Sequence, residues 1–477
     1  MTTTTTASTS PADLRERAPA LRRAVDELQR HAPYAHAFAQ KRSGNVFRAS
    51  TKAQAIEPVD PVSGVVLSAW TGRTLLEVSV PGFDDDSVKG AAARLVDMVI
   101  KEGVVDGPQI DPGAVQESDY VVAEAVPADG LSLDDRLSRM VALKDRIHAR
   151  DARVKNAVAR GTHVRTEELF VSSTKRLWQD LRRAETVCLI VMEENGKMAD
   201  LHGGKGRQGG AEHLGLNPAG FSEKDLDELV HDCALLLKAE RVQGGLWDCV
   251  FLPDMAGLFA HEAFGHGTEA DMFTRKRARG QDFLGKPVAS SLVDMFDDPA
   301  MAGEAGSFFF DHEGQPASRT QIITKGVLTA PMTDLVSAVK LGIPRSANGR
   351  RESVQRKAYT RMTNTIFGPG TSRVDDMIAS LDHGLVVRHA RNGMEDPKGW
   401  GIQCEAYLAE EVKGGKKTGK VFSPVVVTGY VPDLLMSISA VSDVVEIGGL
   451  GTCGKGYKEW VKVTDGGPAL TLKARVA

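Results

Sequence analysis

The stretch from Gly257 to Asp271 constrains this chain more than any other, because it combines two histidines, a glutamate and an apolar approach. Neutral imidazoles are common metal ligands and a neighbouring carboxylate can take a proton from bound water, so this composition indicates a hydrolytic metal site. In the H-E-x-x-H spacing of zinc proteases, both histidines lie on one face of a regular helix. Here His261 and His266 are one residue further apart. At about 100° per residue they would point roughly 140° away from each other.

The two imidazoles can share a metal only if the helix is locally unwound. A π-type turn, which is common at functional sites, brings residues five apart onto nearly the same face. Gly265 directly precedes the second histidine and lowers the cost of such a distortion. The sequence therefore predicts an irregular helix between His261 and His266.

Length and charge limit the classes of function. A chain of 477 residues is too long for a single core, so two or three domains are expected. A net charge of -4 argues against a nucleic-acid partner, and no apolar run reaches the roughly 18 residues of a membrane span. The threonine-rich start, Met1 to Ser10, is expected to be a disordered tail. Few cysteines in so long a chain indicate no disulfide framework and favour a cytoplasmic protein.

The first half of the chain alternates helical and β-prone segments. Helical spacing is expected over residues 14–31, 84–101 and 132–159, with Ser132 as an N-cap. Short strands are expected over residues 44–48, 64–70, 74–80, 167–173 and 186–193. The glycine-rich, periodless segment 197–220 is expected to be a loop or domain junction.

The second half is expected to be mostly β, after a helix capped by Ser222 and a buried strand from Trp247 to Leu252. The helix that carries His261 starts at Pro253. Further strands are expected over residues 320–324, 327–330, 384–389, 404–411 and 422–430. We expect an α+β fold with two domains, an N-terminal mixed sheet with long helices and a C-terminal β-rich domain that carries the metal-binding helix. The expected boundaries are 1–32 for a flexible tail and helix, 33–240 for the N-terminal domain and 241–477 for the catalytic domain.

A glycine-rich loop follows near the end, from Gly448 to Gly456. Its glycines fit a dinucleotide fingerprint, but too little chain follows for the rest of that unit. It also approaches a phosphate-binding loop, yet Gly456 stands where the hydroxyl residue should be. Neither interpretation holds. Cys453 within this loop is either a thiolate that bare backbone brings close to a metal or an inert small residue in a tight turn.

These motifs together resemble the TldD/PmbA family of metallopeptidases, and specifically its metal-bearing TldD branch. The stretch from His261 to Asp271 is similar to that branch's H-E-x-x-G-H-x-x-E-x-D signature. Further blocks resemble the family in the expected order, namely residues 311–314, 348–351, 362–365 and 448–455. Thr268 and Ala270 depart from the commoner Leu and Gly of the signature. The resemblance spans roughly residues 34–475 and is strongest after Gly244.

The resemblance implies one Zn²⁺ per chain, held by His261, His266 and Cys453. With three protein ligands the fourth position stays open to water, and Glu262 is then the expected general base. The implied activity is hydrolysis of extended or unfolded peptides, which an exposed strand edge often holds. The implied assembly is a homodimer or a heterodimer with a PmbA-like subunit. The alternative is a non-catalytic subunit of such a complex with a structural metal.

Other polar residues are weaker candidates. Glu269 and Asp271 either orient the ligand imidazoles or cap the helix end. Arg350 and Arg351 either bind a substrate carboxylate or oxyanion, or form structural ion pairs, and the segment 346–353 around them is expected to be a functional loop. His312 and His383 are expected at the surface beside turns. Three cysteines in apolar runs are expected in the core, namely Cys188, Cys233 and Cys249.

Overall fold

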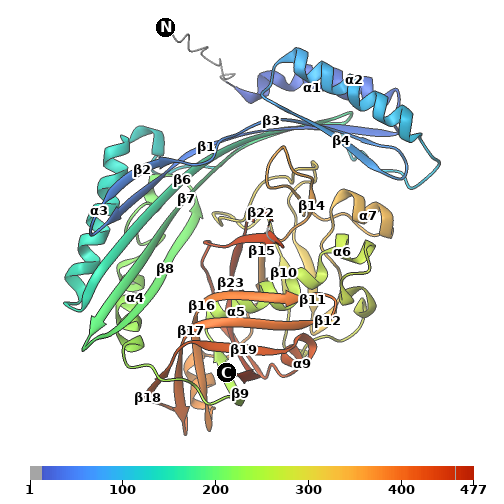
Figure 1. Cartoon of the computed structure of the whole chain (residues 1–477). Coiled ribbons are helices and arrows are strands. Elements are labelled where there is room, and N and C mark those ends of the chain that lie inside the picture. The colour runs from blue at the N-terminus through green and yellow to red at the C-terminus, as the bar shows by residue number, and fades with distance from the viewer. Residues whose placement is uncertain (1–12, 457) are drawn as a thin grey trace.

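A computed structural model describes residues 13–456 and 458–477 (Figure 1). The predicted disordered tail, Met1 to Ser10, lies outside the described residues. Two large sheets organise the chain, and sheet membership changes after β8. Within the described ranges, every helix is too short or too polar to cross a bilayer.

The N-terminal half forms an eight-stranded sheet, in the order β4-β3-β1-β6-β7-β5, with β2 against β1 and β8 against β7. Its strands are β1 (Tyr34–Ser50), β2 (Gln54–Pro58), β3 (Val62–Trp70), β4 (Leu75–Pro81), β5 (Gln116–Val121), β6 (Val154–Ser172), β7 (Lys175–Glu194) and β8 (Lys197–Gln208). Its helices are η1 (Leu14–Arg17), α1 (Ala18–Gln29), α2 (Asp85–Glu102), η2 (Ala128–Gly130), α3 (Leu133–Arg150), η3 (Ala211–His213) and α4 (Glu223–Leu236).

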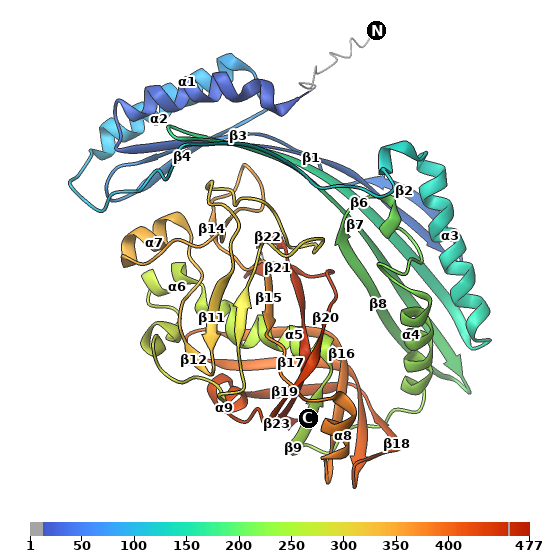
Figure 2. The same cartoon turned by 180° about the vertical axis from the view of Figure 1, so that it is seen from behind.

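This sheet arches over the C-terminal half, with α1 and α2 on its outer face at one end and α3 at the other (Figures 1 and 2). Side chains alternate across a strand, so each face of β1 has its own partner. Ala35, Ala37 and Ala39 share a core with α1 and α2. Phe38, between them, packs instead with Val354 of the C-terminal half. The inner face of the arch therefore packs against the C-terminal half.

Three predicted segments of this half need correction. The helix capped by Ser132 ends at Arg150 rather than near residue 159, because β6 starts at Val154 and pairs with β1 and β7. β1 is far longer than the predicted 44–48, since its alanines carry little β signal. Residues 197–208 form β8 rather than a loop. Its glycines give no periodicity, yet they are needed there, because a Cβ at Gly204 would lie 2.1 Å from the Thr186 carbonyl oxygen.

The C-terminal half forms an eleven-stranded sheet, in the order β12-β11-β10-β15-β23-β19-β17-β16-β9, with β18 against β17, β20 against β23 and a further β23–β9 pairing. Its strands are β9 (Gly245–Phe251), β10 (Met295–Asp297), β11 (Thr320–Thr324), β12 (Val327–Leu328), β15 (Asn364–Phe367), β16 (His383–Asp396), β17 (Gly401–Lys413), β18 (Lys416–Phe422), β19 (Val425–Tyr430), β20 (Ala440–Ile447) and β23 (Thr464–Val476). Two small hairpins stand apart, β13 (Gly349–Arg350) with β14 (Tyr359–Thr360) and β21 (Thr452–Lys455) with β22 (Lys458–Lys462).

The helices of this half are short. They are α5 (Pro253–Ala260), η4 (His261–Gly265), η5 (His266–Thr268), α6 (Ala270–Thr274), η6 (Arg279–Phe283), α7 (Leu335–Leu341), α8 (Val374–Ala379) and α9 (Val431–Met436). The pairing of β23 with β9 closes a ring with β19, β17 and β16. α5 packs so tightly on β23 that a Cβ at Gly257 would lie 2.2 Å from the Gly466 nitrogen. The fold is thus α+β, as predicted, with the histidine-bearing helix fixed in the β-rich half.

Candidate metal centre

The predicted helix irregularity is confirmed. α5 gives way at His261 to one turn of π-helix, which passes at His266 into a short 3-10 turn. The two imidazole rings consequently lie 5.2 Å apart between centroids, at an interplanar angle of 88°. The extra residue that would separate the imidazoles on a regular helix is absorbed by the wider turn.

Close packing, not backbone freedom, explains the glycine before the second histidine. Gly265 has a helical φ of -60°, which any residue can adopt. A Cβ there would, however, lie 2.1 Å from Sδ of the buried Met362. Thr268 stabilises the change of helix type, since its hydroxyl donates to the carbonyl oxygens of Phe264 and Gly265 at 3.0 and 3.2 Å. These carbonyls lose regular helical partners at the transition.

The third candidate ligand comes from the β21–β22 hairpin. Cys453 Sγ lies 3.4 Å from His266 Nε2, and one ligand atom each from His261, His266 and Cys453 fall within 4.8 Å of one another. Zn–S bonds of about 2.3 Å and Zn–N bonds of about 2.0–2.1 Å at a tetrahedral angle separate sulfur and nitrogen by about 3.5 Å. The observed separation and the donor set of two nitrogens and one sulfur therefore fit a zinc ion.

Glu269 and Asp271 hold this arrangement from the next turn. Glu269 is buried, and its Oε2 lies 3.3 Å from His266 Nδ1 and 3.1 Å from Lys455 Nζ. This contact turns Nε2 of the imidazole towards Cys453. Asp271 accepts from Lys455 at 2.7 Å instead of touching an imidazole. Since Lys455 lies two residues after Cys453, both carboxylates tie the cysteine hairpin to the helix, and neither caps a helix with its side chain.

A buried arginine completes the support. Arg361, fully buried, donates to Cys453 Sγ and to the Cys453 carbonyl oxygen, both at 2.9 Å. Its Nε lies 3.5 Å from Glu269 Oε1. Such a donor fixes the sulfur in place and stabilises its thiolate form.

The electrostatics of the cluster favour a thiolate. Burial opposes ionisation of Cys453, but His266 and His261 outweigh it and hold the pKa of the thiol well below its usual range. Burial would likewise lower the pKa of His266, yet Cys453 and Glu269 raise it well above normal. A divalent cation can take the place of the protons that these imidazoles attract.

Glu262 stands beside the cluster, next to a strand. It is half-buried, and a Cβ at Gly393 of β16 would lie 2.4 Å from its Cγ. Residues 392–396 of β16 pair with β17 on one side. On the other side of β16, β9 pairs with residues 384–387 and does not extend to residue 392. Within the described part of the chain, the edge of β16 beside Glu262 is therefore open to a further strand.

Two comparisons with known proteins cover much of the chain. Residues 244–476 match the family model described as PmbA/TldA metallopeptidase C-terminal domain. A Haemophilus influenzae protein named "Metalloprotease TldD homolog" is 30% identical over 387 residues, which are 77% of each chain. The chain belongs to the TldD/PmbA family.

Two further proteins are similar to this chain. A Saccharolobus solfataricus protein named "Zinc metalloprotease TldD homolog" is 26% identical over 50% of this chain and 52% of its own. The crystal structure of TldE from Thermococcus kodakarensis superimposes with a TM-score of 0.74 at 15% identity, covering 96% of this chain and all of the other. The latter establishes the shared fold.

Arg350 and Arg351 are not among the three residues that converge as candidate metal ligands, and the segment predicted to be a functional loop is largely buried. Arg350 donates to the carbonyl oxygens of Met362 and Lys462. Arg351 pairs with Glu77 of β4 at 2.9 Å, and Asn348 binds Asp297 at 2.7 Å. Contacts with the inner face of the arch, such as the Arg351–Glu77 ion pair, bury this polar segment. The same packing leaves His312, predicted at the surface, only 12% exposed at its side chain, beside Glu168 at 3.2 Å.

Sequence reasoning missed Arg361 and Glu395. Arg361 directly precedes the block 362–365, so its place beside a recognised motif was the available signal. Glu395 gave none, because it reaches the site only through the β16–β17 pairing. Burial, followed by Glu262 and Glu269 and only partly offset by His266, raises the pKa of Glu395 well above its usual value. Both of its carboxyl oxygens are buried without a partner in the described part of the chain.

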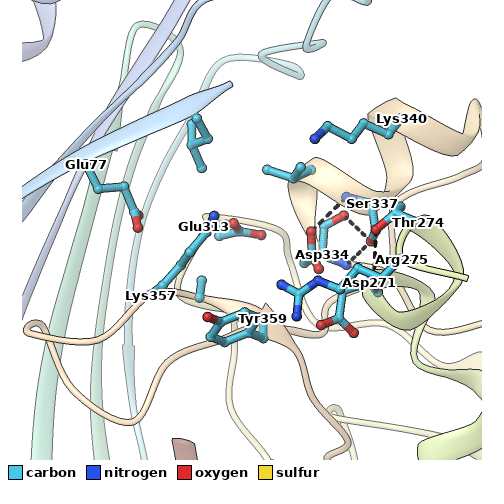
Figure 3. Close-up of a pocket in the computed structure, with 13 residues that line it drawn as sticks. Glu77, Asp271, Thr274, Arg275, Glu313, Asp334, Ser337, Lys340, Lys357 and Tyr359 are labelled. Carbon is cyan, nitrogen blue, oxygen red and sulfur yellow. Dashed lines mark hydrogen bonds between the residues drawn. The ribbon is translucent and has the colours of Figure 1, made fainter. Parts of the chain in front are cut away.

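Asp271 also forms part of the wall of a hollow of about 220 Å³ between the arch and the C-terminal half (Figure 3). Glu77 of β4 faces it from one side and Asp334 from the other, with Glu313 behind. Burial raises the pKa of Asp271 to about 6, with Lys455 acting against that rise. The lining also includes the cations Arg275, Lys340 and Lys357, so Asp271 links the cysteine hairpin to a hollow of mixed charge.

Proposed function

We propose that this protein is a zinc-dependent peptidase of the TldD type, with one Zn²⁺ held by His261, His266 and Cys453. The observation that carries the proposal is the meeting of these three side chains at a π-helical turn, with Glu262 beside them. The metalloprotease names of its relatives support the same reaction class.

Glu262 acts as the general base in this proposal. When bound, zinc supplies a Lewis acid that polarises the scissile carbonyl and lowers the pKa of a water. Glu262 takes a proton from the attacking water and delivers it to the leaving amine, a role that requires a carboxylate with no competing ion pair. Among the described residues, Glu262 has no ion pair within 4 Å, whereas Glu269 and Asp271 are both committed to Lys455.

Extended peptides are the proposed substrates. The open edge of β16 at residues 392–396 runs past Glu262 and could accept a peptide as an additional strand. Met394 on this stretch is 63% exposed, which offers an apolar contact to a substrate side chain. A folded protein presents few such strands, so unfolded segments fit best.

The alternative is a non-catalytic subunit with a structural metal. Structural zinc sites normally use four protein ligands. The cluster found among residues 13–456 and 458–477 has three, which supports a catalytic role. We further propose assembly as a homodimer or as a heterodimer with a PmbA-like subunit. Native mass spectrometry of the protein purified from its source tests both the bound chains and the metal.

The decisive test combines metal analysis with cleavage. We expect one zinc per chain and cleavage of an unfolded protein that stops on chelation and returns with zinc. Glu262→Gln should keep zinc but lose turnover by at least about a hundredfold, the lower range for general-base catalysis. Near-normal turnover in the zinc-loaded variant would remove Glu262 from the mechanism. Full zinc loading without cleavage of any unfolded protein would favour the non-catalytic alternative.

A further inference from the structure

A cavity of about 400 Å³ lies between the inner face of the arch and the C-terminal half, a size that suits a small ligand. β1, β6 and β7 form one wall, and Thr452, Val461 and Lys462 of the β21–β22 hairpin form part of the other. Val461 pairs directly with Cys453 and Thr452 precedes it. The cavity therefore borders the hairpin that carries the candidate metal ligand.

Each acid of this cavity has a polar partner close by. Glu168 pairs with His312 at 3.2 Å, and Glu185 pairs with Lys462 at 2.8 Å. Glu352 lies 3.7 Å from Arg356. Glu185 and Glu352 each have a cation of their own. His312 meets Glu168 as a neutral donor, because its Nδ1 accepts from the Arg351 backbone N–H at 2.9 Å. Among the acids that line the cavity, Glu168 therefore keeps a negative charge that no adjacent cation balances.

Three arginines of the same cavity lack a carboxylate partner among the described residues. Arg42, Arg183 and Arg350 bind backbone carbonyl oxygens, and within the described ranges no carboxylate lies within 4 Å of their guanidinium groups. Burial, Arg183 and Arg361 lower the pKa of Arg350 to about 9, which leaves it charged at neutral pH. Glu168 acts on Arg183 and Arg350 from beyond 4 Å, but it is one negative charge against three positive ones. Buried positive charge in excess of its counter-charge is costly, so the cavity is suited to a further anion.

We propose that this cavity binds a carboxylate of the peptide substrate, with Arg350, Arg183 and Arg42 as its counter-charges. Nε of Arg350, a residue only 5% exposed, has no hydrogen-bond partner in the described part of the chain. Oε1 of Gln40, also 5% exposed and lining the cavity, lacks one too. Arg350 Nε–H can donate to a carboxylate, and Gln40 Oε1 can accept from a peptide N–H. A peptide with a carboxylate therefore fits these two groups better than a bare inorganic anion does.

This inference rests on the proposed peptidase function and gives it a preference for substrates with a carboxylate near the cleaved bond. The carboxylate comes either from the peptide C-terminus or from an Asp or Glu side chain. Both sources present the same planar, bidentate group to a guanidinium.

Equilibrium binding to the full-length, zinc-loaded Glu262→Gln protein tests the inference by calorimetry. The probes are acetylated tetra-alanine with a free carboxylate, the same peptide as a C-terminal amide, and an amide peptide with one internal Glu. We expect the free carboxylate to bind about 10- to 100-fold more tightly than the amide, the range for a hydrogen bond to a charged group. Tight binding of the amide peptide with the internal Glu would show that the cavity also accepts the carboxylate of a Glu side chain.

Matched variants locate the binding. Arg350→Gln should abolish most of the preference for the carboxylate, and Arg42→Gln, at a half-buried position with less risk to folding, should reduce it. Arg48→Gln, an exposed arginine on the same strand, should leave the preference unchanged. Equal affinities for acid and amide peptides, or equal losses in Arg42→Gln and Arg48→Gln, would overturn the inference. Cleavage without any carboxylate preference would refute the inference alone, whereas carboxylate-dependent binding without cleavage would refute only the peptidase function.

Discussion

Replacing Glu269 by Gln should weaken zinc binding while preserving the shape of the site. Glu269 is 1% exposed and faces three cationic groups, His266 Nδ1 at 3.3 Å, Lys455 Nζ at 3.1 Å and Arg361 Nε at 3.5 Å. The pKa of Glu269 stays below its usual range, because Lys455 and His266 outweigh the effect of burial. The carboxylate is therefore charged, and the substitution removes a full negative charge from a buried position.

The magnitude follows from these contacts. Loss of a group that orients a metal-bound imidazole typically costs 10–100-fold in affinity, or about 1.4–2.7 kcal/mol. Breaking a buried ion pair costs about 3–5 kcal/mol of folding stability, and we expect the lower end because Lys455 keeps Asp271. Zinc affinity is measured by competition with a chromophoric chelator, and stability by urea unfolding of the metal-free protein. The two measurements separate loss of the metal from loss of the fold.

Glu411→Gln is the matched control. Glu411 of β17 is 6% exposed and also contacts a histidine, His383 Nε2 at 3.1 Å, but this histidine lies at the start of β16 and is not one of the candidate metal ligands. We expect no change in its zinc affinity. Zinc binding within about twofold of the unsubstituted protein for Glu269→Gln, or an equal loss in Glu411→Gln, would refute the assigned role of Glu269.

Three other predictions concern packing, pH and metal removal. Gly265→Ala should cost about 1–3 kcal/mol in urea unfolding through its clash with Met362, whereas Gly90→Ala, in open space on α2, should stabilise by about 0.5–1 kcal/mol; equal effects would contradict the packing argument. Burial, then Asp334, raises the pKa of Glu313 to about 8. The folded protein thus holds a proton that the unfolded chain releases above about pH 4.5, and stability should fall by up to about 1.4 kcal/mol per pH unit towards pH 8. Glu313→Gln should flatten that slope in unfolding titrations, and an unchanged slope would exclude Glu313 as its source. Chelation should lower the midpoint of thermal unfolding in the unsubstituted protein much more than in Cys453→Ser, because zinc stabilises only the folded site. Equal shifts would place the metal elsewhere.

The sequence predicted the elements whose signal is local. Ser132 and Ser222 each form the predicted capping contact at a helix start. The hairpin of β11 and β12 pairs as expected. The sequence did not predict β8 at all and predicted β1 only in part. The glycines of β8 allow neighbouring backbone to approach closely, and the alanines of β1 pack against helices, so neither residue type gives a strand signal.

The same division runs through the candidate site. The spacing of His261 and His266 alone required a π-helical turn, because side-chain direction along a helix is set by its residues per turn. The sequence could not show that Arg361 donates to a sulfur 92 positions away, or that Glu395 comes to rest beside the same helix. Nor could it show that three arginines from separate segments share one cavity without ion pairs. These meetings depend on how the arch and the β-rich half bury their facing surfaces, and only the tertiary structure decides that.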